Sequence, residues 1–310
     1  MVDVSAYRVG LIVPTLNAGS LWADWLTAAA NQTLTLQRKL VVDSASDDNT
    51  VSMAQAQGFE VLPIERKDFN HGTTRQLAAE YLADCDLLVF LTQDAVLAAP
   101  DALANIIRPF ATDADIAMSY GRQLPHKNAG SIGSHARLFN YPAVAQVKGK
   151  ANIPQLGIKT TFCSDSFACY RRAELMAQGG FKHDLIFGED AHIAARMVLA
   201  DKKIAYVAEA AVYHSHDYTI EQDFKRYFDV GVFHAREAAL LSQFGGATGE
   251  GLRFVKSELR YVLKNSPILL LSVMVRTLAK FVAYKMGKQE QRLPLWLKKR
   301  VSMHKRYWQT

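Results

Sequence analysis

Two stretches determine the architecture: VGLIVPTLN at residues 9–17 and LVVDSASDDNT at residues 40–50. In each, a short apolar run ends abruptly in polar residues, at Pro14 in the first and at Asp43 in the second. Uninterrupted apolar runs of this length are typical of strands buried on both faces of a parallel sheet. The polar residues then lie at the carboxyl ends of the strands, where such sheets bind their ligands.

The same alternation continues through the first 120 residues. Further strand signals lie at 59–64 and 87–91, and helix-like segments lie at 21–30, 47–58 and 73–83. Repeated β-α-β units of this kind predict an α/β fold, in which a mostly parallel central sheet carries helices on both faces.

The rest of the chain is less regular. Residues 122–152 carry Gly, Pro, Asn and Lys and predict a long loop region with one short helix. Strand and helix signals resume at 162–170 and 190–199, and two strands are expected at 204–207 and 211–214. From Thr219 onward the pattern predicts helices, with apolar residues at helical spacing through 252–285.

The composition is that of an ordinary globular protein of 310 residues. With 49% hydrophobic and 21% charged residues, it excludes a wholly disordered chain, a collagen-like repeat and a polytopic membrane protein. Cys85, Cys163 and Cys169 are too few for a disulfide framework, and none forms a CxxC pair. The cysteines therefore predict a reducing compartment and no structural zinc site.

The basic charge is concentrated in one segment. Residues 251–310 hold 14 Lys and Arg against 2 Asp and Glu, a net charge of +12, so the remaining 250 residues sum to −6. Arg276 and Lys280 interrupt apolar residues there, and Trp296 precedes the basic run 298–300. This pattern predicts an amphipathic segment on an anionic membrane surface. A helical hairpin packed on the catalytic domain or on a second subunit is the alternative, and no nucleic-acid-binding motif accompanies the charge.

The N-terminal sequence and the hydropathy bear on location. No secretion signal opens the chain, because its start lacks a basic region followed by a long apolar run. No run of 18 apolar residues exists. We therefore expect a cytoplasmic protein with a membrane-facing tail.

Four clusters of polar residues follow the first four expected strands. They are PTLN at 14–17, DSASDDNT at 43–50, FNHGTTR at 69–75 and TQDA at 92–95. Asp47 and Asp48 are explained as well by capping of a helix, and Asn17 by a plain turn. Four clusters on one rim of one sheet nevertheless predict a ligand site.

These residues resemble a known family. VPTLN at 13–17, VVDSASDDNT at 41–50, Asp94 and GED at 188–190 resemble family 2 glycosyltransferases, whose nucleotide-sugar-binding α/β fold is called GT-A. The resemblance covers most of residues 8–216. FNHGTTR at 69–75, LTQDA at 91–95 and HSHDY at 214–218 are similar to bacterial rhamnosyltransferases, as are the stretch 227–236 and the ending Met303-His304-Lys305 with Trp308.

The resemblance implies a donor site for a nucleotide sugar. Asp43 would hydrogen-bond the pyrimidine or the ribose, and Arg75 would contact the base or its neighbouring groups. Asp94 matches the last carboxylate of the family's Asp-x-Asp motif, which holds Mg²⁺ or Mn²⁺ on the diphosphate. The full set of implied donor-binding residues is Pro14, Thr15, Asn17, Asp43, Arg75, Gln93 and Asp94.

The sequence departs from the family pattern at the metal. Thr92 replaces the first Asp of the motif, so that a histidine is expected to complete the site, His214 first and His216 second. An ordinary surface or core role is the alternative for either histidine. Leu16 stands where many relatives carry an aromatic residue, so that stacking on the base is expected to be weaker or supplied elsewhere.

Asp190 matches the family's catalytic base. An inverting transfer needs one base, which takes the proton of the attacking acceptor hydroxyl. The alternative for Asp190 and Glu189 is an acidic helix N-terminus, where carboxylates are favoured anyway. Glu189 and Asp165 are assigned to acceptor binding, with a core strand end as the alternative for Asp165.

Together these inferences define one expectation. Residues 1–218 form a GT-A catalytic domain and 219–310 a helical, basic region that contacts a membrane surface or a second copy in a homodimer. The enzyme would move rhamnose from dTDP-rhamnose to a lipid-linked oligosaccharide acceptor during O-antigen or similar polysaccharide synthesis, as a peripheral protein on the inner face of the plasma membrane. The alternatives are a UDP-hexose donor, a nucleotidyltransferase, which the lack of Lys or Arg in 17–20 disfavours, and a non-catalytic membrane-attached binding module.

Overall fold

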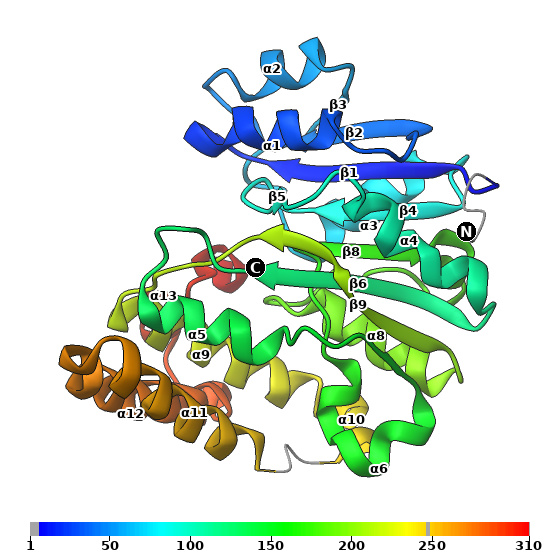
Figure 1. The fold of residues 1–310 in the computed structure, drawn as a ribbon. Helices are drawn as coiled ribbons and strands as arrows, with labels where there is room; N and C mark the ends of the chain where they lie inside the picture. Colours follow the sequence, from blue (N-terminus) through cyan, green and yellow to red (C-terminus); the bar gives the residue numbers. More distant parts are fainter. Residues whose placement is uncertain (1–5, 246–248, 310) are drawn as a thin grey trace.

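One sheet runs through the centre of the molecule in the computed structural model, which describes residues 6–245 and 249–309 (Figure 1). Within these residues the sheet has nine strands, in the order β3-β2-β1-β4-β8-β6-β9-β5, with β7 beside β9. Helices cover both of its faces, as the sequence predicts.

The first four predicted strands are confirmed. They are β1 (Val9–Thr15), β2 (Arg38–Asp43), β3 (Glu60–Pro63) and β4 (Leu87–Leu91), and they pair in parallel. The intervening helices are α1 (Trp22–Ala30), α2 (Thr50–Ala56) and α3 (His71–Tyr81). Trp22 and Trp25 of α1 pack on one face of the sheet, and Ala78 and Ala79 of α3 pack on the other. All five residues of β4 are buried, which explains its uninterrupted apolar run.

Beyond β4 the sheet is mixed. The next strands are β5 (Val96–Leu97), β6 (Ile116–Leu124), β7 (Gln146–Lys148), β8 (Phe167–Arg171) and β9 (Lys203–Tyr213). Strand β8 is antiparallel to β4 and β6, whereas β6 and β9 are parallel.

Two expectations for this half need correction. The strands expected at 204–207 and 211–214 are one strand, β9, whose register against β6 shifts between Gly121 and Arg122. Residues 122–152 are not mainly loop, because they include the end of β6, α5 (Ser131–Asn140) and β7. A Cβ at Gly121 would lie 2.3 Å from the Phe167 ring and 2.5 Å from the Ala210 carbonyl, so only glycine fits this irregularity.

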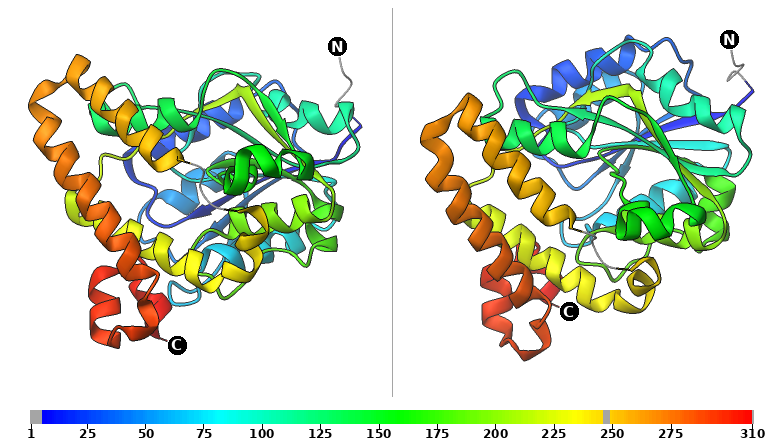
Figure 2. Two further views of the ribbon diagram at one scale, coloured as in Figure 1. Left: turned by 90° about the horizontal axis from the view of Figure 1, so that it is seen from below. Right: turned by 60° about the horizontal axis from the view of Figure 1, so that its bottom comes forward.

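The last third of the described chain is helical, as predicted. Its helices are α9 (Ile220–Arg236), α10 (Ala238–Leu241), α11 (Glu250–Asn265), α12 (Leu270–Gly287) and α13 (Leu295–Val301). The remaining helices are α4 (Ala102–Thr112), α6 (Ile153–Leu156), α7 (Arg172–Ala177) and α8 (Glu189–Leu199). The expected helical run 252–285 is broken at Pro267, which lacks the N–H that a continuous helix needs. Figure 2 shows the two resulting helices, α11 and α12, along one side of the molecule.

Helix α12 packs closely on α9. A Cβ at Gly287 would lie 2.0 Å from the Phe228 carbonyl oxygen, and one at Gly231 would lie 2.3 Å from the Tyr284 carbonyl oxygen. The two backbones approach at these glycines. On the same side of α12, Arg276 Nη1 lies 2.6 Å from Asp223 Oδ2 of α9.

The helical region shares a core with the loop that precedes α8. Leu185 and Ile186 of that loop cluster with Phe228 and Phe233 of α9 and with Trp308 near the C-terminus. Helix α9 therefore supports the start of α8. The boundary at residue 218 between a catalytic domain and a helical region stays a prediction.

Candidate active site

The carboxyl ends of β1 and β2 are joined by hydrogen bonds around Asp43. Thr15 lies opposite Asp43 in the register, and its hydroxyl donates to Asp43 Oδ1 at 2.8 Å. The Ser46 amide donates to Asp43 Oδ2 at 2.8 Å, and its hydroxyl donates to Oδ1 at 2.6 Å. Asp43 is buried, so these donors hold its carboxylate in a fixed position.

The loops after β1 and β2 are also tied together by Asn17. Its amide donates to Ser46 Oγ at 2.8 Å, and its side-chain oxygen accepts from the Asp47 amide at 2.9 Å. Asn17 has a φ of 46°, a left-handed conformation that Asn tolerates. Asp48 accepts from the Thr50 amide at 2.9 Å and so caps the first turn of α2. These contacts are structural, and donor binding by Asn17 stays a prediction.

A cavity of about 210 Å³ opens at this edge of the sheet. Of the predicted donor-binding residues, Pro14, Thr15, Arg75 and Gln93 line it. Gln93 is held there by Leu16, whose amide donates to Oε1 at 2.8 Å and whose carbonyl accepts from Nε2 at 3.1 Å. The other lining residues are Leu16, Ser44, Arg66, Phe69, His71, Thr92 and Arg306. Neither Arg66 nor Arg306 is among the site residues predicted from the sequence.

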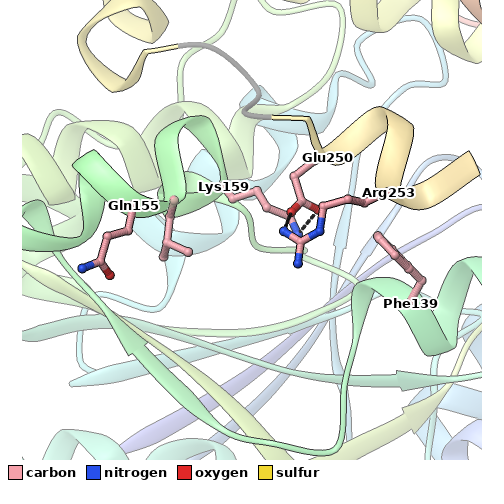
Figure 3. Close-up of a pocket in the computed structure, with 6 residues that line it drawn as sticks. Phe139, Gln155, Lys159, Glu250 and Arg253 are labelled. Atoms are coloured by element: carbon pink, nitrogen blue, oxygen red, sulfur yellow. Dashed lines mark hydrogen bonds and ion pairs between the residues drawn. The ribbon is translucent and has the colours of Figure 1, made fainter. Parts of the chain in front are cut away.

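A second cavity, of about 340 Å³, lies away from these residues (Figure 3). Its charged groups are paired with one another, because Glu250 lies 2.5 Å from Lys159 Nζ and 2.6 Å from Arg253 Nη1. None of the predicted site residues lines it. The smaller cavity is therefore the candidate site.

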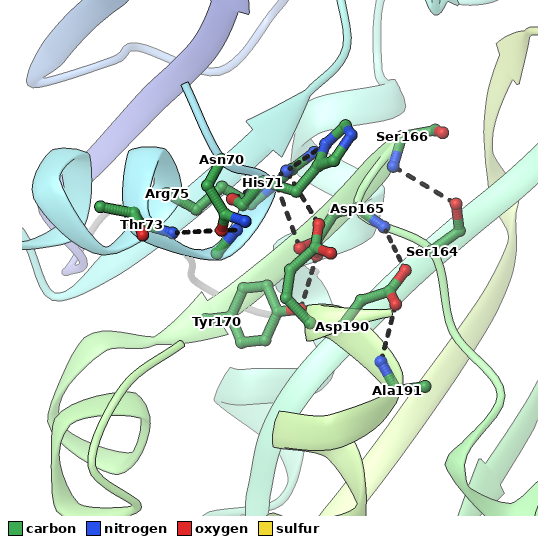
Figure 4. A network of polar contacts seen from close by, with 12 residues as sticks. Asn70, His71, Thr73, Arg75, Ser164, Asp165, Ser166, Tyr170, Asp190 and Ala191 are labelled. Carbon is green, nitrogen blue, oxygen red and sulfur yellow. Dashed lines mark hydrogen bonds and ion pairs between the residues drawn. The ribbon is translucent and has the colours of Figure 1, made fainter. Parts of the chain in front are cut away.

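Arg75 is the centre of a buried ion network (Figure 4). Its Nη1 lies 2.8 Å from Glu189 Oε1, and its Nε lies 3.2 Å from Asp165 Oδ2. Tyr170 also donates its hydroxyl to Asp165 Oδ1 at 2.5 Å. The structure thus brings a predicted donor residue and two predicted acceptor residues into one cluster. Because the one guanidinium contacts both carboxylates, these three side chains hold one another in position. Their direct contact with either substrate stays a prediction.

Asp190 lies beside this network at the start of α8. The Asp165 amide donates to its Oδ2 at 3.3 Å and the Ala191 amide to its Oδ1 at 2.7 Å (Figure 4). Gly188 precedes the helix with a φ of 82°, and a Cβ there would lie 3.1 Å from the Phe233 ring. Burial, and next the charge of Glu189, raise the pKa of Asp190 to about 6. At neutral pH the carboxylate is therefore ionised and still basic enough to accept a proton.

The three predicted metal ligands converge. Asp94 follows β4, whereas His214 and His216 follow β9, and their ligand atoms all lie within 4.8 Å of one another. Asp94 Oδ2 is 3.5 Å from His214 Nε2 and 3.7 Å from His216 Nε2. Ligands about 2.1 Å from a common ion lie about 3 Å apart at right angles, so a small contraction would enclose one. Burial lowers the pKa of both histidines, that of His216 to about 4, so both imidazoles are neutral and able to bind a cation.

Gln123 of β6 orients His214, a role that the sequence analysis missed. Its Oε1 lies 2.9 Å from His214 Nδ1 and also accepts from Arg137 Nη1 at 2.5 Å. Because the oxygen can only accept, His214 carries its proton on Nδ1 and turns the lone pair of Nε2 toward Asp94. The missing signal was β6 itself, whose C-terminal end fell in the expected loop.

The comparisons with known proteins agree on the family. The model of glycosyl transferase family 2 matches residues 11–177. The O-antigen chain rhamnosyltransferase RfbN of Salmonella typhimurium is 49% identical over 302 residues, which cover 97% of this chain and 96% of that protein. The O-antigen chain rhamnosyltransferase WbaN of Salmonella anatum is 47% identical over 299 residues, which cover 96% and 95%.

Solved structures show the same fold. The mannosyltransferase PcManGT from Pyrobaculum calidifontis, in complex with GDP-Man and Mn²⁺, matches with a TM-score of 0.61 and 17% identity, over 93% of this chain and 89% of that one. At this identity the match concerns the fold alone. The mixed sheet with helices on both faces is the GT-A fold that the sequence predicts.

The Asp94, His214 and His216 cluster is expected to bind Mn²⁺ more tightly than Mg²⁺, because two imidazoles suit Mn²⁺ and Mg²⁺ prefers oxygen. His214→Ala should weaken Mn²⁺ binding at least tenfold, and Gln123→Ala by about tenfold through loss of orientation. Titration calorimetry with each metal in the presence of a nucleoside diphosphate would measure this. His183→Ala, at an exposed histidine that contacts Thr73, is the matched control, and equal losses in all three variants would contradict the assignment.

Proposed function

This chain belongs to glycosyl transferase family 2, and from that premise we propose that it moves rhamnose from dTDP-rhamnose, with inversion, to a lipid-linked glycan acceptor in O-antigen synthesis. One observation carries the proposal: over nearly its full length, the chain is 47–49% identical to two O-antigen chain rhamnosyltransferases. The chain is a glycosyltransferase, and the donor, the stereochemistry and the acceptor are the proposed parts.

The donor cavity would hold the nucleoside against Thr15, whose hydroxyl donates to Asp43, although Asp43 itself does not line the cavity. On donor binding, the Asp43 carboxylate would accept from the N–H of a pyrimidine or from a ribose hydroxyl. Arg75 forms the wall beside it, held by Asp165 and Glu189. A divalent cation held by Asp94, His214 and His216 would neutralise the charge that develops on the departing diphosphate.

Asp190 would be the base of the transfer. As the acceptor hydroxyl oxygen attacks the anomeric carbon, its proton passes to the Asp190 carboxylate. A new C–O bond forms on the face opposite the leaving group, the bond to the phosphate oxygen breaks, and dTDP departs. One base on one face suffices, because no covalent enzyme intermediate is formed. The proposed products are an inverted rhamnoside and dTDP.

An apolar surface on α12 supports action at a membrane. Its exposed side chains recur at helical spacing, namely Leu271, Met274, Val275, Leu278, Phe281 and Val282, and Ile268 is exposed in the turn just before the helix. The segment Pro267–Gly287 has the length and hydropathy of a membrane span, but α9 packs against its other side. Leu295 and Trp296 are also exposed, just before the basic run 298–300. We assign these surfaces to an anionic bilayer interface and place the enzyme on its cytoplasmic side.

One donor assay tests the function. Purified enzyme with Mn²⁺ and lipid-linked oligosaccharides extracted from a bacterium with a rhamnose-containing O-antigen should release dTDP from dTDP-rhamnose and extend the lipid by one deoxyhexose mass. Mass spectrometry of the lipid would measure this. Extension with UDP-glucose in place of dTDP-rhamnose would keep the family and overturn the donor. The absence of both transfer and donor binding would favour a non-catalytic module.

The raised pKa of Asp190 predicts that kcat/KM falls at acid pH. Below pH 6, kcat/KM should fall about tenfold per pH unit, because the carboxyl is then protonated and cannot accept a proton. Above pH 6 the carboxylate is ionised, and the rate should reach a plateau. Asp190→Asn should lower kcat by about 10²–10⁴-fold and leave the Kd of dTDP unchanged. Full transfer by this variant would refute the base assignment.

If the apolar surface of α12 attaches the enzyme to a membrane, charged substitutions in this surface should weaken vesicle binding. Replacing both Leu271 and Leu278 with Glu should weaken binding to phosphatidylglycerol-containing vesicles at least tenfold, because two apolar side chains leave the interface. Vesicle flotation would measure it, with Val144→Glu, an equally exposed apolar position elsewhere, as the matched control. A lipid-free dimer that the double variant dissociates would assign the surface to a second copy instead.

A further inference from the structure

We propose that the segment Ser302–Trp308 completes the donor cavity and that its Arg306 binds the diphosphate of the donor. The inference rests on the proposed function, because it takes the ligand to be a nucleoside diphosphate sugar. It adds a donor-binding residue from a segment far from the sheet edge in sequence.

The segment is anchored at both ends. Asp229, buried in α9, accepts from the Met303 amide at 2.9 Å and from the His304 amide at 3.4 Å. At the other end, Trp308 is buried in the cluster that includes Phe228 and Phe233 of α9. Arg306 lies between these anchors, so its backbone is fixed beside the cavity.

Aromatic contacts bring the segment to the start of α3. The His304 ring meets the ring of His71 edge to face at 5.3 Å, and it stacks on Phe187 at 6.2 Å. His71 itself lines the cavity. Burial lowers the pKa of both histidines to about 3, so the pair is neutral and the segment contributes positive charge there through Arg306.

Arg306 differs from the other arginines of the cavity. Arg75 is paired with Asp165 and Glu189, and Arg66 is paired with Asp47 at 3.0 Å. Arg306 donates from Nη1 to the Arg66 carbonyl. Across residues 6–245 and 249–309, no carboxylate lies within ion-pair distance of it. It is thus the cavity arginine whose charge has no protein counter-ion in the described chain.

The chemistry of the ligand matches this cation. The charged residues that line the cavity are Arg66, Arg75 and Arg306, and the first two are already paired with carboxylates. A guanidinium binds phosphate oxygens with charge-assisted, often bidentate hydrogen bonds. Arg306 would supply these from the cavity mouth, on the side of β3 and α3.

Calorimetric titration of the intact protein with dTDP and Mn²⁺ tests the proposal. Arg306→Gln should raise the Kd about tenfold, the usual effect of losing one charged hydrogen bond. Lys305→Gln is the matched control, since it removes an equal charge from the neighbouring exposed residue, which does not line the cavity, and should change the Kd less than twofold. Arg306→Lys should fall between wild type and Arg306→Gln, and thymidine should bind all four proteins alike.

Hydrogen exchange provides a second readout that does not depend on affinity alone. In the wild type, dTDP should slow exchange of the amides in 302–308, because the ligand bridges the segment to the sheet edge. In Arg306→Gln this slowing should be lost, although the amides remain protected by Asp229 in the free protein. Unchanged melting of the variant would exclude a general loss of structure.

The outcomes separate the two proposals. Wild type and Arg306→Gln binding dTDP equally would overturn the role of Arg306 and leave the proposed function standing. If the wild type binds UDP or GDP instead of dTDP and Arg306→Gln weakens that binding, the inference holds and the proposed donor falls. A wild-type protein that binds no nucleoside diphosphate would overturn both.

Discussion

The guanidinium of Arg75, shared by the carboxylates of Asp165 and Glu189, governs the geometry of the site. All three groups are almost fully buried, and a buried charge is tolerated only when a partner offsets the loss of water. The three residues come from α3, from the turn before β8 and from the start of α8. Arg75 lines the cavity, and Asp190 directly follows Glu189 in the chain. The ion pairs of Arg75 with Asp165 and Glu189 therefore hold Asp190, the proposed base, in a fixed position beside the cavity.

The sequence predicted what depends on local pattern. Strands β1 to β4 were evident because each is a short apolar run that ends in polar residues, and their carboxyl ends were correctly placed on one rim. Asp94, His214 and His216 meet as expected, although more than a hundred residues separate Asp94 from the histidines. Strand β6 and the continuity of β9 were missed because their irregular pairing at Gly121 leaves no simple alternation. Gln123 and Arg306 were missed for a related reason, because only contacts distant in sequence bring them to the site: Gln123 contacts His214, and Arg306 contacts Arg66.

Helix α12 turns its cations toward the protein. The sequence predicted an amphipathic segment but not which side of it meets the protein, and in the structure Arg276 and Lys280 both pair with Asp223 of α9. The apolar side chains are left outside, which no isolated helix in water would favour. The pairing of Arg276 and Lys280 with Asp223, rather than the sequence of the helix itself, determines which side of α12 faces outward. A hydropathy pattern gives the two sides of a helix but not which of them meets the protein.

Helix α9 has a consequence for the reach of the enzyme. One of its sides meets α12 at Gly231, with no room for a side chain, and another packs Phe233 on Gly188, two residues before Asp190. Through these contacts α9 joins the apolar surface of α12 to the start of α8, so that the described residues hold this surface and the Asp190 carboxylate in one packed unit. If the apolar surface of α12 rests on a bilayer, Asp190 lies at a fixed height above that bilayer. Lipid-linked acceptors would then be selected by how far their terminal hydroxyl projects from the bilayer. The enzyme would discriminate acceptors by the length of the glycan without contacting each of its sugars.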